Sequence, residues 1–146
     1  MKKEYIGKYL SIARRAQAKL LDQKLKKYHI SHAQLSLLMT LYNHEGICQQ
    51  ELCRILNINK AAVTRELKDL EHKNYITKVR DQNDRRRFLV YLTDKALKNK
   101  KGIIAILDKI EEQMRADISE NKIDEFLDLI KSICTNLNSK TLEEGE

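Results

Sequence analysis

The sequence contains no proline and no tryptophan, and aromatic residues make up only 5% of it. Without proline, a long helix can run uninterrupted, and a kink inside a helix needs another cause. No apolar run approaches the roughly 20 residues that a membrane-spanning helix needs. The basic N-terminus also lacks the apolar segment that signal peptides carry. These absences predict a helix-rich protein that stays in the cytoplasm and away from membranes.

The motifs of common enzyme classes are absent as well. There is no glycine-rich phosphate-binding loop, no nucleophile elbow and no helical metal-binding motif. Cys48, Cys53 and Cys134 form no Cys-x-x-Cys pair. In a reducing compartment, we expect them to be buried or partly buried thiols that pack as small hydrophobic residues. We therefore expect a protein that is not an enzyme and that binds no cofactor and no metal ion.

Charge is abundant and unevenly distributed. Charged residues make up 34% of the chain, and the formal net charge is +7. Residues 1–53 carry a net charge of +5, residues 54–101 carry +8, and residues 102–146 carry −6. A basic middle and an acidic C-terminal part indicate that the middle meets a polyanion. Charge alone does not separate DNA from RNA or from an anionic membrane.

A helix-turn-helix pattern lies in this basic middle. Residues 47–56 predict a short helix, whose inward positions carry apolar residues: Leu52, Ile55 and Leu56. Residues 57–59 form the turn, and Asn59 can cap the helix predicted for residues 60–73. The buried stripe of that second helix is apolar: Val63, Leu67 and Leu70. Its opposite face carries small, hydrogen-bonding or cationic side chains that suit the major groove of DNA: Lys60, Ala61, Thr64, Arg65 and Lys68.

Two strands joined by a polar loop follow the second helix. Residues 75–80 and 88–92 predict the strands, and the loop of residues 81–87 ends in three arginines: Arg85, Arg86 and Arg87. A ribbon of this kind can lay a guanidinium into a minor groove of DNA. Asp84 is placed to hold one of these arginines in an extended conformation, which reduces the entropy lost on binding.

Long amphipathic helices flank this unit. Apolar residues recur at three- to four-residue spacing over residues 4–28, over residues 94–118, and again after a break near residues 119–121. One more helix follows Ser31, whose side chain is suited to cap it. The apolar faces of the terminal helices are too broad for free-standing helices. We therefore expect these helices to form a dimerisation bundle.

These patterns predict a mainly α fold of the α+β class, in which terminal helices present a winged helix-turn-helix DNA-binding unit. We assign residues 1–146 to a single domain. Within it, we expect residues 1–30 and 103–140 to supply the dimerisation helices, and residues 31–102 to form the winged helix-turn-helix region. We expect residues 141–146 to be frayed.

Two segments of the sequence resemble the MarR (multiple antibiotic resistance regulator) family, and the resemblance covers nearly the whole length. The first segment reads QELCRILNINKAAVTRELKDLEHKNYI, and the second reads DQNDRRRFLVYLT, which looks like the family's wing signature. Asp84 and Arg86 occupy the Asp-x-Arg positions of that signature. Asn74 stands where the family often has glycine, and asparagine also tolerates the left-handed conformation.

The resemblance implies a homodimer that binds a palindrome in double-stranded DNA. It implies that Arg86 enters the minor groove with Asp84 as its orienting partner. It also implies groove-facing residues in and before the second helix: Asn59, Lys60, Thr64 and Arg65. Many members release DNA when a small, often phenolic or anionic, effector binds. We therefore expect a sequence-specific transcriptional regulator, and in particular a repressor that an effector releases.

Other interpretations stay open on the sequence alone. The basic face could be a solvated surface, and a winged helix could serve as a protein-interaction module. Some members of the resembled family sense zinc or oxidants. Against zinc, no histidine lies in the long helix after the wing, and a zinc site needs three or four convergent ligands. Cys48 and Cys53 fall within the short helix of the DNA-binding unit, so oxidation of either could disturb binding.

Overall fold

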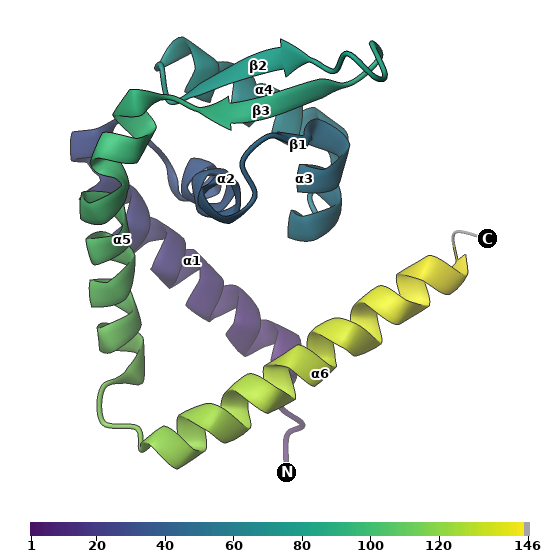
Figure 1. Ribbon diagram of the computed structural model, residues 1–146. Coiled ribbons are helices and arrows are strands. Elements are labelled where there is room, and N and C mark those ends of the chain that lie inside the picture. The colour runs from purple at the N-terminus through teal and green to yellow at the C-terminus, as the bar shows by residue number, and fades with distance from the viewer. Residues whose placement is uncertain (145–146) are drawn as a thin grey trace. The chain divides into compact units, whose positions relative to one another are not determined.

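The computed structural model describes the backbone of residues 1–144 and the side chains of residues 1–138. The elements follow in this order: α1 (Ile6–Leu25), the 3-10 helix η1 (Lys26–Tyr28), α2 (His32–Asn43), β1 (Ile47–Cys48), α3 (Gln49–Leu56), α4 (Lys60–His72), β2 (Ile76–Arg80), β3 (Phe88–Leu92), α5 (Asp94–Arg115) and α6 (Glu120–Glu144). The chain divides into two compact units, Met1–Ile110 and Glu111–Glu146. The prediction of a mainly α fold with a winged helix-turn-helix unit is confirmed (Figure 1).

The first unit holds a small antiparallel sheet in the order β1-β3-β2 (Figure 1). Arg80 at the end of β2 pairs with Phe88 at the start of β3, so residues 81–87 form the loop of a hairpin, as the sequence predicts. The other edge of β3 pairs with β1, where Ile47 lies opposite Val90. The prediction that the short helix begins at residue 47 is therefore wrong, because the first two residues form a strand and α3 begins at Gln49.

Gly46 makes this third strand possible. Its φ of 81° lies in the left-handed region, and a Cβ atom added to it would lie 3.0 Å from the ring of Tyr91. Its backbone N–H donates to the carbonyl of Val90 over 2.8 Å, which brings the chain onto β3 before α3 starts. A glycine suits this position because only glycine adopts such a conformation without steric cost.

Local capping sets the ends of the helices. The Ser31 hydroxyl accepts from the backbone N–H of Gln34 over 3.2 Å, and the Gln34 side chain accepts from the backbone N–H of Ser31 over 3.1 Å. This capping box confirms Ser31 as the cap of α2. Asn74, after α4, has a φ of 65°, as the sequence predicts for a left-handed asparagine.

A leucine- and isoleucine-rich core joins the helix-turn-helix to the sheet and to α5. It includes the predicted stripe of α4 and buried residues of the other elements: Leu21, Leu25, Leu38, Leu41, Leu52, Val63, Leu67, Leu70, Tyr75, Val90 and Ile103. The prediction that Ile55 faces inward is wrong, because its side chain is 41% exposed. The inner face of the eight-residue α3 consists of the buried Leu52 and the half-buried Cys53 and Leu56.

The second unit consists of the end of α5, a turn and α6. The backbone of residues 141–144 continues α6, whereas the sequence predicts fraying there, and the last two residues of that prediction lie outside the described residues. Cys134 is exposed, so the prediction of a buried or partly buried thiol is wrong at this position and is confirmed at Cys48 and Cys53. Among residues 1–144, no helix is both long and apolar enough to cross a membrane.

Candidate nucleic-acid interface

The exposed face of α4 carries the residues that the sequence predicts for the major groove. Asn59 caps the helix, because its side-chain oxygen accepts from the backbone N–H of Ala62 over 2.8 Å. Val63, Leu67 and Leu70 are buried, which turns the opposite face to solvent. The exposed residues of that face are Lys60, Ala61, Thr64, Arg65 and Lys68. The structure therefore brings these side chains together on one solvent-facing surface of one helix.

A buried glutamine of α2 links α2 to α4 through hydrogen bonds. The Gln34 amide donates to Glu66 over 3.0 Å and to Asp69 over 2.5 Å, and its oxygen accepts from Lys73 over 3.3 Å. Lys73 Nζ also lies 2.7 Å from Asp69 Oδ2, and this hydrogen bond, followed by the one from Gln34, lowers the pKa of Asp69. Sequence reasoning missed this role of Gln34, although the Ser31-x-x-Gln34 spacing of the capping box marks the residue.

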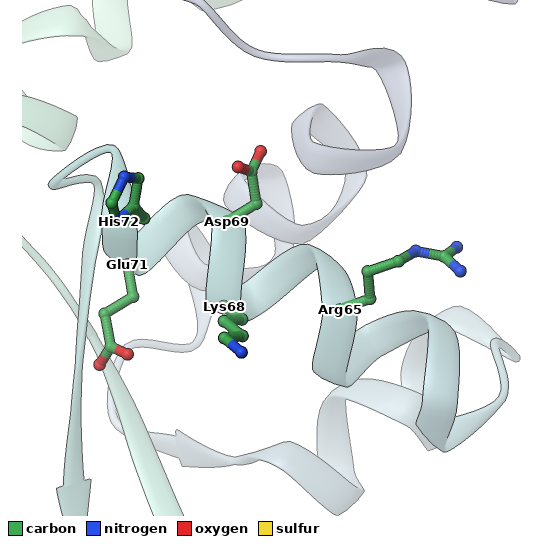
Figure 2. A pocket seen from close by; sticks show the side chains of 5 residues that line it. All are labelled: Arg65, Lys68, Asp69, Glu71 and His72. Atoms are coloured by element: carbon green, nitrogen blue, oxygen red, sulfur yellow. The ribbon is translucent and has the colours of Figure 1, made fainter.

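The C-terminal half of α4 carries side chains of both charges. Figure 2 shows the five side chains that line a shallow hollow of about 470 Å³ here: Arg65, Lys68, Asp69, Glu71 and His72. Arg65 extends away from the helix, while Lys68 and Asp69 point to different sides of it (Figure 2). Carboxylates among the cations restrict where a polyanion can approach, because like charges repel. The first half of α4 is thus the more favourable half for phosphate contact.

Asp84 holds Arg86 at the tip of the wing. The Asp84 carboxylate accepts from Arg86 Nε and from the Arg86 backbone N–H, each over 3.1 Å. These two hydrogen bonds, with the side-chain bond the larger effect, lower the pKa of Asp84. Arg86 nevertheless keeps 90% of its side chain exposed. The contact that the sequence predicts between Asp84 and an arginine is therefore present, and Arg85 beside it is also exposed.

A second ion pair anchors the base of the wing. Asp81 is only 6% exposed, and its carboxylate accepts from Arg87 over 3.0 Å and from the backbone N–H of Asn83 over 2.9 Å. The guanidinium of Arg80 lies 4.7 Å from the centre of the Phe88 ring on the paired strand. Sequence reasoning missed the pairing of Asp81 with Arg87, although their positions at the two ends of one hairpin loop place them opposite each other.

A hollow of about 480 Å³ lies between α3, the start of α4 and the wing, and we call it the wing hollow. It is lined by polar, cationic and thiol side chains with one aromatic ring: Cys48, Gln49, Gln50, Cys53, Lys60, Thr64, Lys78, Arg86, Arg87 and Phe88. Gln49 Nε2 donates to Thr64 Oγ1 across it, over 2.5 Å. Sequence reasoning missed Gln49, which carries no local signal of its contact with α4.

Within the described part of the chain, no group of three or more His, Cys, Asp or Glu side chains is arranged as a metal site requires. His32, one of the histidines that the sequence offers, is bound to Asp22 instead. The Asp22 carboxylate accepts from the His32 backbone N–H over 2.7 Å and contacts its Nδ1 over 3.0 Å. The pair ties the start of α2 to α1.

Comparison with known proteins identifies proteins that are similar to this chain in sequence and in structure. A model of the MarR family matches residues 30–88. The HTH-type transcriptional regulator YdgJ of Bacillus subtilis is 33% identical over 110 residues, which are 75% of this chain and 67% of that protein. A MarR transcriptional regulator from Methanosarcina mazei Go1 has a similar crystal structure, with 28% identity, a TM-score of 0.87, and coverage of 94% of this chain and 99% of that one.

A third similar protein was solved with DNA. It is described as a MarR family transcriptional regulator from Listeria monocytogenes complexed with 26mer DNA. The identity is 22%, the TM-score is 0.88, and the match covers 94% of this chain and 92% of that one. At this identity, the likeness shows that the two chains share a fold.

Proposed function

Since this chain belongs to the MarR family of helix-turn-helix transcriptional regulators, we propose that it binds a palindrome in double-stranded DNA as a homodimer, and that it is a repressor released by a small-molecule effector. In this proposal α4 enters a major groove and the wing reaches the flanking minor groove. The proposed contacts come from α4 and the wing: Asn59, Lys60, Ala61, Thr64, Arg65, Lys68, Asp84, Arg85 and Arg86. The proposed place of action is the cytoplasm, where a regulator of this kind would meet DNA.

The state of Arg86 is the observation that carries the DNA-binding part. A guanidinium that is 90% exposed would ordinarily sample many rotamers, but this one donates two hydrogen bonds to the Asp84 carboxylate, from Nε over 3.1 Å and from Nη2 over 3.4 Å. Ordering before binding reduces the entropy lost when the side chain enters a groove. A narrow minor groove concentrates negative potential and attracts arginine. The arrangement is therefore suited to a polyanionic duplex.

The proposed dimer rests on apolar side chains that each unit leaves exposed. On α1 and just before it, Tyr5 is 65% exposed and Ile6 is 63% exposed. On α6, Phe126 is 56% exposed and Leu129 is 64% exposed. Exposed apolar side chains grouped on one element mark an interaction surface. We propose that residues 1–30 and 103–140 bury them against a second copy, and that residues 31–102 bind DNA.

A hollow between α1, η1 and α5 supports the proposed class of effector. It measures about 320 Å³, and it is lined by three lysines, one tyrosine and small or apolar residues: Lys24, Lys27, Lys109, Tyr28, Gly102, Ala105 and Ile106. Cations beside apolar surface suit a small anionic or phenolic compound, since the charge and the ring each find a partner. An effector bound there would contact α1 and α5, which pack against the DNA-binding unit.

The test is a titration of the purified protein against DNA fragments, including its own promoter region, at two salt concentrations. Each phosphate that the protein neutralises steepens the loss of affinity with salt. Selective binding with a steep salt dependence is the expected result. Weak binding without preference for any fragment would refute the DNA-binding proposal and favour a winged helix that binds another protein.

A response to oxidants is a second candidate, favoured by the two thiols of the wing hollow. Cys48 and Cys53 are half-buried and share the hollow with Lys60 and Arg86. Oxidation adds polar oxygen atoms to a thiol, which here would lie beside proposed DNA contacts. If the candidate holds, peroxide should release DNA from the wild type and leave a Cys48→Ser, Cys53→Ser double variant bound. Equal release from both proteins would exclude it.

A further inference from the structure

The hydrogen bond between Gln49 and Thr64 joins the first residue of α3 to the solvent-facing side of α4. Gln49 Nε2 donates and Thr64 Oγ1 accepts, over 2.5 Å. The two side chains lie in the wing hollow with Lys60 and Arg86. The contact bridges the two helices of the helix-turn-helix at the proposed DNA surface.

The donor role of Gln49 leaves the proton of the Thr64 hydroxyl available. A hydroxyl has one proton to donate and two lone pairs to accept with. Four other helical hydroxyls use their proton within their own helix, on the carbonyl four residues earlier: Ser36, Thr40, Ser132 and Thr135. Among residues 1–138, the hydrogen bonds of the structure give the Thr64 hydroxyl no acceptor. Its O–H is free to donate to a ligand outside the protein.

We propose that Gln49 is a positioning residue that sets the hydrogen-bond polarity of Thr64, so that Thr64 reads DNA as a donor. The inference rests on the proposed function. In the major groove, guanine offers acceptors at N7 and O6 and thymine at O4, whereas cytosine offers only the N4 donor. Thr64 in this state therefore selects guanine or thymine over cytosine at one position of each half-site. Gln49 acts on specificity without touching the base.

The test is a selection of binding sites from a library of randomised duplexes, made with the wild type and with Gln49→Glu. A carboxylate only accepts hydrogen bonds. The Thr64 hydroxyl therefore donates its hydrogen bond to the carboxylate at position 49, and its lone pairs are left to accept from the groove. The expected result is a change at one position of each half-site, from guanine or thymine to cytosine or adenine. The preference should shift by about three- to tenfold, the range of one hydrogen bond.

Gln50→Glu is the matched control. Gln50 is the next residue, lines the same hollow and is exposed, and the substitution adds the same negative charge beside DNA. It should weaken binding to all sequences alike and leave the selected motif unchanged. A motif that changes equally in Gln50→Glu would overturn the proposal, because the added charge would then be the cause.

Three further variants test whether Gln49 acts through Thr64. Thr64→Val keeps the shape and removes the hydroxyl, so the preference at the same position should flatten. Adding Gln49→Glu to Thr64→Val should then change nothing more, since the group through which Gln49 acts is gone. Gln49→Ala, which disturbs α3 least, should also flatten that position, with the midpoint of thermal unfolding as the check on folding.

The outcomes separate the inference from the proposed function. A wild type that selects no motif would refute sequence-specific DNA binding and the inference with it. A wild type that selects a motif which Gln49→Glu and Thr64→Val leave intact would refute the inference alone. Uniform weakening by Thr64→Val, with no change in base preference, would place the hydroxyl on a phosphate and would also overturn it.

Discussion

At the scale of single residues, the two carboxylates of the wing have different tasks. Asp81 is buried and ties Arg87 to the base of the hairpin, while Asp84 holds a side chain that projects into solvent. An exposed ion pair such as Asp84–Arg86 contributes little to folding stability. Its benefit is the ordering of Arg86 before any ligand arrives. Loss of Asp84 should thus affect DNA affinity more than the free energy of unfolding.

Arg86→Ala should lower affinity for all duplexes by a similar factor. The guanidinium is proposed to lie in a minor groove, where width and potential matter more than base identity. The slope of log affinity against log salt should also fall by about 1. Anisotropy titrations over several salt concentrations measure both quantities. Arg14→Ala removes the same charge from the exposed surface of α1 and should change neither; an equal effect would mean that net charge alone governs binding.

Arg65→Ala should act differently, because Arg65 extends from the middle of α4 (Figure 2). If it contacts a base, the loss should cost about 1–3 kcal/mol on the preferred site and relax specificity at one position. Competition titrations with single-base variants of the selected site measure that change. Wild-type affinity and selectivity in this variant would show that Arg65 does not face the groove.

Tyr42 provides a pH-dependent contribution to stability. Its hydroxyl donates to the carbonyl of Ala96 over 2.7 Å, and burial, followed by the neighbouring Tyr75, raises its pKa to about 12. The folded state holds this proton more tightly, so the contribution is complete below pH 10 and is lost as the pH rises toward 12. Tyr42→Phe should cost about 1 kcal/mol at pH 8 and soften the decline above pH 10. Urea unfolding measures both effects, and the exposed Tyr9→Phe should show neither.

At the scale of elements, helices are the part of this fold that the sequence predicts best. Three- to four-residue spacing accumulates over a helix of 20 residues such as α1. A strand of two residues gives no alternation to detect, which is why the sequence predicts a helix where β1 lies. The wing contact of Asp84 with Arg86 is local and was predictable. The contacts of Gln34 with Asp69 and of Gln49 with Thr64 join residues 35 and 15 positions apart, and only the folded chain reveals them.

Asn59→Ala tests the cap of α4. The substitution leaves a backbone N–H of the first turn without its partner, so it should lower the free energy of unfolding by about 1 kcal/mol. Urea unfolding without DNA measures this separately from any role of Asn59 in binding. Asn121→Ala, in the first turn of α6, removes an exposed side chain that has no hydrogen bond to any of residues 1–138. It should change stability much less, and equal losses would argue against the cap.

At the scale of the whole molecule, net charge distinguishes the part proposed to bind DNA from the C-terminal part. Residues 54–101 carry +8 and residues 102–146 carry −6. Such a distribution steers a polyanion toward one part of the surface and speeds association at low salt. The acidic C-terminal part itself repels a polyanion. The charge distribution therefore helps to orient the protein on DNA, in addition to the contacts that single side chains make.

Leu129→Glu tests whether two copies act together. If α6 forms part of a dimer interface, a charge in place of a leucine that is 64% exposed in one copy would lie buried in the pair. The variant should be monomeric by light scattering. A monomer engages only one half-site, so affinity should fall by roughly 10²- to 10⁴-fold, the usual gain from linked binding. Lys131→Glu changes the charge by more but lies about 200° around the helix, and it should leave the dimer intact. A dimeric Leu129→Glu with wild-type affinity would exclude this face of α6 from the interface.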